Sequence, residues 1–242
     1  MRDDKDLNFL ANVPSEKLDP LVQIITQKKN GKSRFSESLT SHSLFIEHSP
    51  DHHQYWHNIA DELQRFGANS IATAIRGKGV LYHEIVKDVA EKLEIEVSKS
   101  DSVADIEQNI LIQIVTKSLA ELSPQDLKDL TDELELETTD FTAQAVSIAL
   151  GLAVKRRGFI AYKVAAIVAS AVSKQLLGQG LKFGANMGIS RTLGFILGPI
   201  GWTVTGAWTA ADIAGPAYRV TIPAVIQIAL LRAQQGQEDK LV

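Results

Sequence analysis

The uneven distribution of charge is the feature that most constrains how this 242-residue chain folds. Residues 1–140 contain 26 acidic and 15 basic residues, whereas residues 141–242 contain 3 acidic and 10 basic residues. Between Phe141 and Gln237 the only acidic residue is Asp212. Such a split indicates either that the two parts attract each other within one fold or that the basic part meets an acidic partner. We therefore divide the chain into an acidic soluble helical module (1–138), a basic glycine-rich apolar helical module (139–233) and a polar tail (234–242).

Apolar residues recur at helical spacing in both modules. One stripe follows a helix-capping serine at Ser102, with Asp105 three residues later, and Ser123-Pro124 marks the start of another helix. No segment alternates apolar and polar residues with a period of two, so strands are not expected. We predict an all-α bundle of roughly ten to twelve helices in two layers. Turn residues predict loops near residues 28–33, 49–51, 67, 77–79 and 97–101.

Glycine spacing distinguishes the basic module. Glycine lies at every fourth position in two runs, Gly180, Gly184 and Gly188, then Gly194 and Gly198. Because glycine is unfavourable inside helices, this repetition indicates close helix packing. The turn at 198–201 predicts a hairpin with arms at 187–197 and 202–213, and the uncharged run 192–211 is long enough to cross a bilayer core. Two alternatives stay open: a hairpin buried in a soluble domain, or one that inserts into or lies on a membrane.

Two further apolar helices complete the basic module. The first is predicted at about 159–177, and the second begins at Gly215-Pro216. The second carries too many apolar positions for one narrow stripe, so we expect it to be largely buried. Those positions are Val220, Ile222, Val225, Ile226, Ile228 and Leu231.

Three long motifs carry a family resemblance. They are Trp-x-x-Ile-Ala-x-Glu-Leu-Gln-x-Phe-Gly-x-x-Ser-Ile-Ala at 56–72, Arg-Gly-x-Gly-x-x-Tyr at 76–82 followed by Asp-Val at 88–89, and Ala-Tyr-Arg-Val-Thr-Ile-Pro-Ala-Val-x-Gln-Ile-Ala at 217–229. Together with Asp-Leu-x-Phe-Leu at 6–10, they resemble the bacterial YaaW family, over residues 5–232. That family has no established activity, so the resemblance implies no cofactor or catalytic residue. A more distant likeness to the ubiquinol–cytochrome c chaperone family implies a role in assembly at a membrane.

Motifs for catalysis or cofactor binding are incomplete. Gly31-Lys32-Ser33 ends like a phosphate-binding loop but lacks the earlier glycine and the preceding strand, and His83-Glu84 lacks the second histidine of a zinc-protease helix. The chain has no cysteine. His53 and His57 would share a helix face, which makes them weak candidates for a metal site. We expect no cofactor and no enzymatic activity.

Two sets of charged residues are candidates for structural or interaction roles. Within the family-like motifs, the charged side chains form either a buried ion-pair network or a site: Glu62, Arg65, Arg76 and Asp88, with Arg219 as an interaction candidate. The basic run Lys155, Arg156 and Arg157 gives the apolar module a basic surface. Few aromatic residues separate the bases, so an anionic membrane surface suits this region better than a nucleic acid.

These patterns favour a non-enzymatic protein-binding or assembly (chaperone-like) factor, acting on a protein partner or at a membrane surface. The alternatives are a membrane-inserting protein that uses the glycine-rich hairpin, and an enzyme with a site near residues 56–88. The polar, acidic start shows no secretory signal. We expect a cytoplasmic protein, peripheral at the inner membrane in the membrane-associated cases.

Overall fold

The computed structural model describes residues 2–27, 32–34, 37–70, 79–178, 181 and 218–238. Within these residues it holds nine α-helices and three short 3-10 helices, and the β pairing there is one isolated bridge between Gln27 and Ser33. The prediction of an all-α fold is confirmed. The predicted hairpin, with Gly180, Gly184, Gly188, Gly194 and Gly198, lies outside the described residues.

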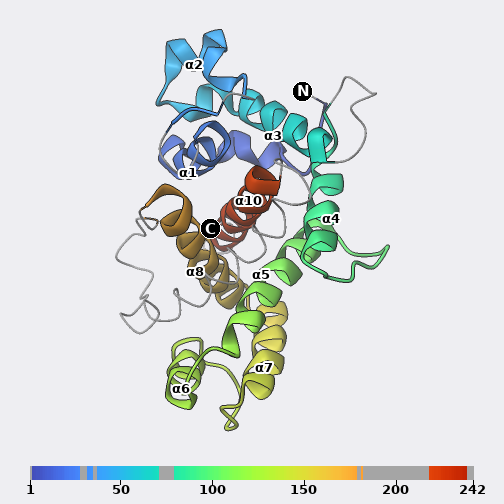
Figure 1. The fold of residues 1–242 in the computed structure, drawn as a ribbon, viewed down its shortest axis with the longest axis vertical. Helices are drawn as coiled ribbons and strands as arrows, with labels where there is room; N and C mark the ends of the chain where they lie inside the picture. The colour runs from blue at the N-terminus through green and yellow to red at the C-terminus, as the bar shows by residue number, and fades with distance from the viewer. Residues whose placement is uncertain are drawn as a thin grey trace.

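The helices form an elongated bundle (Figure 1). In chain order they are η1 (Asn8–Asn12), α1 (Ser15–Thr26), η2 (Leu39–Ser41), α2 (Ser43–His48), η3 (His52–Tyr55), α3 (Trp56–Ser70), α4 (Tyr82–Lys92), α5 (Val103–Leu119), α6 (Pro124–Glu133), α7 (Ala143–Arg156), α8 (Gly158–Leu177) and α10 (Tyr218–Glu238). Figure 1 shows α2 at one end of the molecule and α6 and α7 at the other. The helices α8 and α10 lie between these two ends.

Local capping signals explain where two of the central helices begin. The Ser102 hydroxyl accepts a hydrogen bond from the Asp105 amide, and the Asp105 carboxylate accepts one from the Ser102 amide, which closes a capping box at the start of α5. Ser123 and Asp126 form the same box at the start of α6, where Pro124 occupies the first turn. Both helix starts were predicted from the sequence, and both are confirmed.

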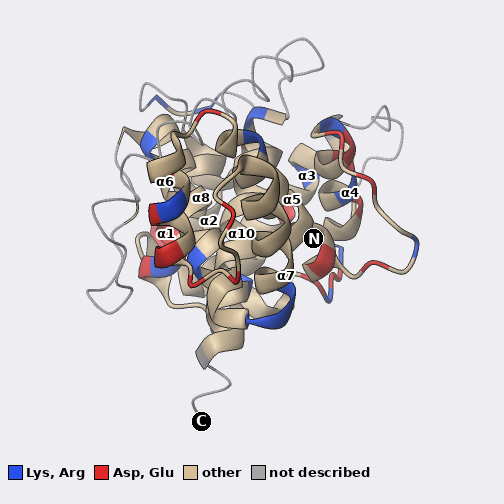
Figure 2. Cartoon of the chain, turned by 90° about the horizontal axis from the view of Figure 1, so that it is seen from below, with Lys and Arg blue, Asp and Glu red and all other residues tan. Residues whose placement is uncertain are grey.

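The last helix, α10, organises the core. It packs against α8 most extensively and also against α1, α3, α4 and α5. All six of its predicted apolar positions are at most 3% exposed. One continuous hydrophobic core runs from Leu7 to Leu231, so the acidic and basic parts of the sequence share it. Figure 2 shows the charged residues around the periphery of this bundle.

Within the described residues, α8 is the one helix long and apolar enough to cross a membrane by length and composition. In the fold, 72% of its apolar window is buried, against α10, α7 and α5. The core of the bundle therefore accounts for its apolar character.

Gly67 corrects the sequence-based prediction of a loop. It lies inside α3, which runs without a break from Trp56 to Ser70. A Cβ atom at this position would lie 2.5 Å from Cγ1 of Ile85 and 2.8 Å from Cγ2 of Val80. The glycine therefore lets α4 and the segment before it approach the backbone of α3 closely, rather than turning the chain.

Candidate docking surface and buried polar groups

A buried carboxylate anchors the N-terminal segment to the body of the protein. Asp4 is 2% exposed, and its Oδ2 accepts hydrogen bonds from the Tyr82 amide at 2.6 Å and from Nε2 of Gln64 at 3.1 Å. The Gln64 side chain also accepts from the Arg2 amide and donates to the Arg2 carbonyl. Asp4 and Gln64 thus hold residues 2–6 against α3 and the start of α4.

A second group of polar side chains extends this network to the last helix. The Tyr82 hydroxyl donates to Oε1 of Glu107 at 2.7 Å, and Nε of Arg232 donates to Oε2 of Glu107 at 2.8 Å. Arg232 also donates to the Asp6 carbonyl at 2.7 Å and lies 4.5 Å from the centre of the Phe9 ring. We call Asp4, Gln64, Tyr82, Glu107 and Arg232 the buried polar hub. It joins the N-terminal segment to α3, α4, α5 and α10.

The electrostatics of the hub follow from its burial. Burial, reinforced by the charge of Glu107, raises the pKa of Tyr82 well above its usual value. Burial also raises the pKa of Glu107, although Arg232 opposes this effect. Desolvation lowers the pKa of Arg232, because burial disfavours the charged guanidinium. The attraction of the Glu107 carboxylate is the main effect that opposes this, and the net result is a raised pKa of Arg232. These groups satisfy one another inside the core, so the hub fastens helices together.

The polar residues predicted as a network lie in two separate places. The Glu62 carboxylate accepts hydrogen bonds from the amide and hydroxyl of Ser38, at 3.1 and 2.6 Å. Arg65 pairs with Asp61 one turn away and donates to the same Ser38 hydroxyl at 3.3 Å. Glu62 and Arg65 therefore meet at Ser38, where they fasten the segment before η2 to α3. Arg76 lies outside the described residues.

Asp88 lies apart from Glu62 and Arg65, on α4. Its Oδ2 atom is buried and has no hydrogen-bond partner among the described residues. Burial, followed by the charges of Glu91 and Glu84, raises the pKa of Asp88 to about 6. Asp88 in turn contributes to a raised pKa of Tyr218, whose main cause is burial. Asp88 therefore binds a proton more tightly in the native state than in the unfolded chain.

In the histidine-rich segment, the buried residue is His52. Its Nδ1 lies 2.5 Å from the Tyr55 hydroxyl and its Nε2 lies 3.3 Å from Oδ1 of Asp19. Since a carboxylate only accepts, Nε2 carries a proton toward Asp19, and in the tautomer that has its single proton there Nδ1 accepts from the Tyr55 hydroxyl. Tyr55 is 0% exposed, and burial raises its pKa. This chain of hydrogen bonds therefore pins η3 to α1.

The weak metal candidates are on the surface. His53 and His57 are both exposed, and the His57 ring stacks on Trp56 with 3.6 Å between ring centres. In the part of the chain that the structure describes, no group of three or more histidine, aspartate or glutamate side chains is placed to hold a metal ion.

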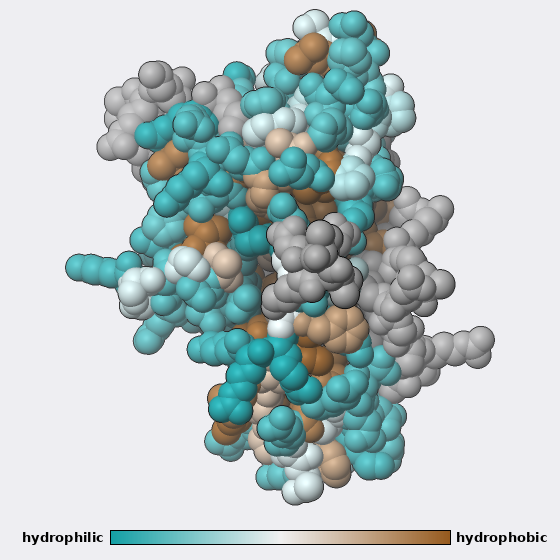
Figure 3. Space-filling model, turned by 180° about the vertical axis from the view of Figure 1, so that it is seen from behind, coloured by the Kyte–Doolittle hydropathy of each residue, from teal (hydrophilic) through white to brown (hydrophobic). Residues whose placement is uncertain are grey.

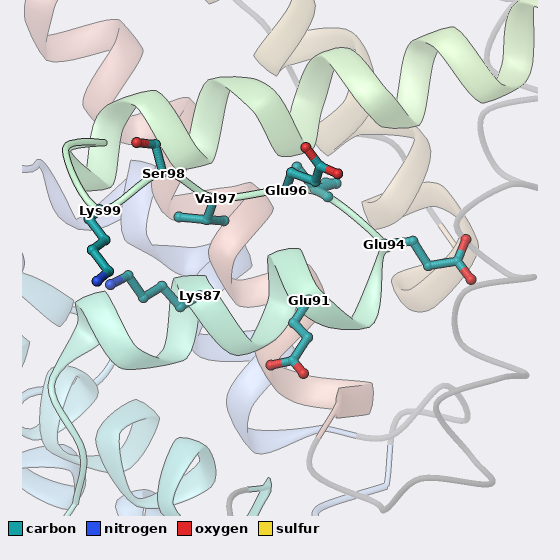
Figure 4. Close-up of a pocket in the computed structure, with 8 residues that line it drawn as sticks. Lys87, Glu91, Glu94, Glu96, Val97, Ser98 and Lys99 are labelled. Atoms are coloured by element: carbon teal, nitrogen blue, oxygen red, sulfur yellow. The ribbon is translucent and has the colours of Figure 1, made fainter.

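A cavity of about 530 Å³ lies between α4 and the loop 94–99. Figure 4 shows the amino groups of Lys87 and Lys99 side by side at one end. Glu91, Glu94 and Glu96 line the rest, so carboxylates outnumber amines along its walls. The cavity therefore has no marked preference for an anionic ligand.

The outer face of α7 combines apolar and basic side chains. Four large apolar side chains are exposed among the described residues. Two lie on α7, Ile148 at 60% and Leu152 at 49%, and a third, Phe159 at 48%, follows in the first turn of α8. Lys155 and Arg156 are exposed beside them and form no ion pair in the described part of the chain. We call Ile148, Leu152, Lys155, Arg156 and Phe159 the α7 surface. Figure 3 shows brown apolar patches among teal hydrophilic residues at the end of the molecule where α6 and α7 lie.

The geometry of the helix explains why these residues share a face. Leu152 and Arg156 follow Ile148 at steps of four, and Lys155 follows Leu152 by three, which places all four on one side of α7. Opposite them, Val146, Leu150, Ala153 and Val154 are buried against the bundle. Phe159 lies in the first turn of α8, just after the junction between the two helices.

The other predicted basic residues are engaged elsewhere. Arg157 donates to the Glu135 carbonyl at 2.6 Å and lies 3.9 Å from the Glu135 carboxylate. Lys163 donates to the Glu133 carbonyl at 3.1 Å. Both therefore attach α8 to the end of α6. Arg219 is exposed at the start of α10, and its charge adds to burial in lowering the pKa of Arg34.

Comparison with known proteins places this architecture among similar chains. Residues 1–35 match a family model described as "Domain of unknown function (DUF3944)". A "UPF0174 protein" of Helicobacter pylori strain J99 is 46% identical over 240 residues, which cover 98% of this chain and 95% of that protein. "UPF0174 protein YaaW" of Escherichia coli strain K12 is 33% identical over 240 residues, 95% of this chain and 94% of that protein. No solved structure matches, and these relatives give no support to the likeness to the ubiquinol–cytochrome c chaperone family.

Proposed function

Because the chain belongs to the UPF0174 (YaaW) family, whose relatives carry no activity in their names, we propose a function from its architecture: a non-enzymatic assembly factor that acts by docking. In this proposal it binds a protein partner and works at a membrane surface, on the cytoplasmic side. The observation that carries the proposal is the α7 surface, where large apolar side chains and two bases face outward together.

The rest of the described fold makes this surface stand out. The apolar residues of the bundle form one core, and the polar groups of the hub bind one another within it. Single exposed apolar residues are ordinary, whereas contiguous ones mark interaction sites, and Ile148 and Leu152 lie one turn apart on the same face of α7. Burying such side chains against a partner releases roughly 25 cal/mol for each Å² of apolar surface removed from water.

The two alternatives from the sequence gain no specific support. A membrane-inserting hairpin would use residues 187–213, which lie outside the described residues. An enzymatic site near residues 56–88 would need polar side chains that meet at an accessible point. Among the described residues there, Glu62 and Arg65 meet at Ser38 and Gln64 and Tyr82 lie in the hub, while Asp88 lies apart from both groups.

The proposal is tested by disrupting the α7 surface in cells. The double variant Ile148→Ser/Leu152→Ser removes two outward apolar side chains and leaves the buried face of α7 intact. We expect the parent protein to sediment with larger assemblies in a gently prepared lysate and the double variant to sediment at the size of the free chain. Ile46→Ser is the matched control, because Ile46 is 71% exposed on α2, at the opposite end of the molecule (Figure 1). Equal sedimentation of parent and double variant would refute docking through α7.

A further inference from the structure

We infer that the α7 surface docks on the headgroup region of an anionic lipid bilayer. This inference rests on the proposed function and names the partner of that surface. The α7 surface suits a partner that presents negative charges directly beside apolar groups. A bilayer of acidic phospholipids offers both, since phosphates lie directly above the acyl chains.

The side chains of the surface match those two layers. Ile148 is 60% exposed and Leu152 and Phe159 are about half exposed, and each can enter the upper part of the acyl region. Lys155 and Arg156 lie between them along the face, where their long side chains reach the phosphates. Helices that lie in the membrane interface typically carry Lys and Arg beside exposed Leu and Phe.

The shape of the surface also favours a bilayer. Four of the five residues of the α7 surface lie on the outer side of α7, near the end of the bundle (Figure 1), and Phe159 follows in the first turn of α8. The side of a helix is convex, so the residues on α7 form a ridge rather than a groove. The cavity described above lies instead beside α4, between that helix and the loop 94–99. A helix of a partner protein is usually held in an apolar groove. The surface of a fluid bilayer can accommodate such a ridge, because the lipids rearrange around each inserted side chain.

The charges near α7 predict a weak and reversible contact. Hydrogen bonds from Ser102, followed by the charge of Lys155, lower the pKa of Asp105, so one acidic group lies close to Lys155. Arg157 and Lys163 are bound to the end of α6. Two bases therefore face outward without a partner carboxylate within hydrogen-bonding distance in the described residues. Each basic residue near an acidic membrane contributes about a fivefold gain in binding, so apolar insertion and charge are both needed.

The experiment uses the purified full chain and floating vesicles. The vesicles are of phosphatidylcholine alone or of phosphatidylcholine with phosphatidylglycerol. We expect the protein to float with the acidic vesicles, to bind neutral ones far less, and to dissociate as sodium chloride is raised. Lys155→Gln/Arg156→Gln should lower the affinity for acidic vesicles about 30-fold. Ile148→Ser/Leu152→Ser should lower it about 10-fold or more.

Matched controls separate this surface from the rest of the protein. Lys87→Gln/Lys99→Gln removes the same charge from the two lysines labelled in Figure 4, and Ile46→Ser removes an isoleucine on α2 that is more exposed than Ile148. Both should bind acidic vesicles like the parent. If the controls lose as much affinity as the α7 variants, or if the α7 variants bind like the parent, the inference is overturned.

A second measurement reports insertion directly. In Phe159→Trp, the new indole should be quenched by lipids brominated on their acyl chains, beyond the quenching seen for the parent protein. No added quenching on acidic vesicles would exclude insertion at α7. If the parent fails to bind acidic vesicles while Ile148→Ser/Leu152→Ser still releases it from assemblies in lysate, the lipid inference fails and docking onto a protein remains. If neither effect is found, both proposals fail.

Discussion

Replacing Arg232 with methionine should destabilise the protein through a group that the substitution does not touch. Arg232 supplies the positive charge that faces Glu107, which is 2% exposed, through a hydrogen bond of 2.8 Å. Methionine retains an unbranched apolar stem but is shorter and removes the charge. Glu107 then keeps only the Tyr82 hydroxyl as a donor, and the Asp6 carbonyl loses its partner.

The magnitude follows from what is left unpaired. Removing one partner of a buried ion pair costs about 3–5 kcal/mol. The Arg232 side chain is 25% exposed, so water can reach the vacated position and the lower end of that range applies. We expect a loss of about 3 kcal/mol in the free energy of unfolding at neutral pH. The assay is urea unfolding followed by circular dichroism.

The pH dependence provides an independent check. Burial already raises the pKa of Glu107, and without Arg232 it rises further. An acid whose pKa is raised on folding stabilises the native state at low pH, and this contribution is lost as the pH increases. The deficit of Arg232→Met should therefore be largest at alkaline pH and shrink as the pH falls and Glu107 takes up a proton.

Two further variants decide whether the reasoning holds. Glu107→Gln/Arg232→Met removes the unpaired charge, so it should recover about half of the loss or more. Arg65→Met breaks an exposed pair with Asp61 and should cost less than about 1 kcal/mol. If Arg232→Met costs no more than Arg65→Met, or if the double variant recovers nothing, the hub does not stabilise the fold in the way described.

Three other predictions concern single positions. Asp88→Asn should stabilise the protein by about 1 kcal/mol at pH 8 and by nothing below pH ~4, because the pKa of about 6 penalises the native state only as the carboxyl ionises; equal unfolding curves at pH 8 would contradict this. Gly67→Ala should destabilise the protein by about 1–3 kcal/mol, because the new Cβ would lie 2.5 Å from Cγ1 of Ile85. Gly151→Ala places its Cβ in open space in α7 and should stabilise the protein by about 0.5–1 kcal/mol. Thermal unfolding that ranks the two variants in reverse would refute the packing role of Gly67. Tyr55→Phe should cost about 1–2 kcal/mol in urea unfolding, because Nδ1 of buried His52 loses its donor, and an unchanged midpoint would show that this hydrogen bond contributes nothing.

Features with local causes could be predicted from the sequence. The starts of α5 and α6 depend on a serine and an aspartate three residues apart, which the chain brings together without help from the fold. The burial of α10 follows in the same way from the number of its apolar positions. Gly67 was misread because its role is close packing against α4, a contact that its neighbours in sequence do not reveal.

The candidate sites were harder to predict because they depend on tertiary contacts. Glu107 and Arg232 are 125 residues apart, and no spacing rule connects them. In the basic run, Lys155 and Arg156 end α7 and face outward, whereas Arg157 has extended backbone at the junction with α8 and turns to Glu135. The histidines divide in the same way, with His52 buried and His53 exposed.

The position of α10 at the centre of the bundle has a consequence for the order of events during synthesis. The ribosome makes this helix after all the helices that it packs against, and Glu107 is made 125 residues before Arg232. Until α10 emerges, the carboxylate of Glu107 lacks its cation, and the apolar faces of α1, α5 and α8 lack the surface that covers them. The nascent chain must therefore keep these faces apart from one another and from other proteins until α10 is available, so completion of this core waits for that helix.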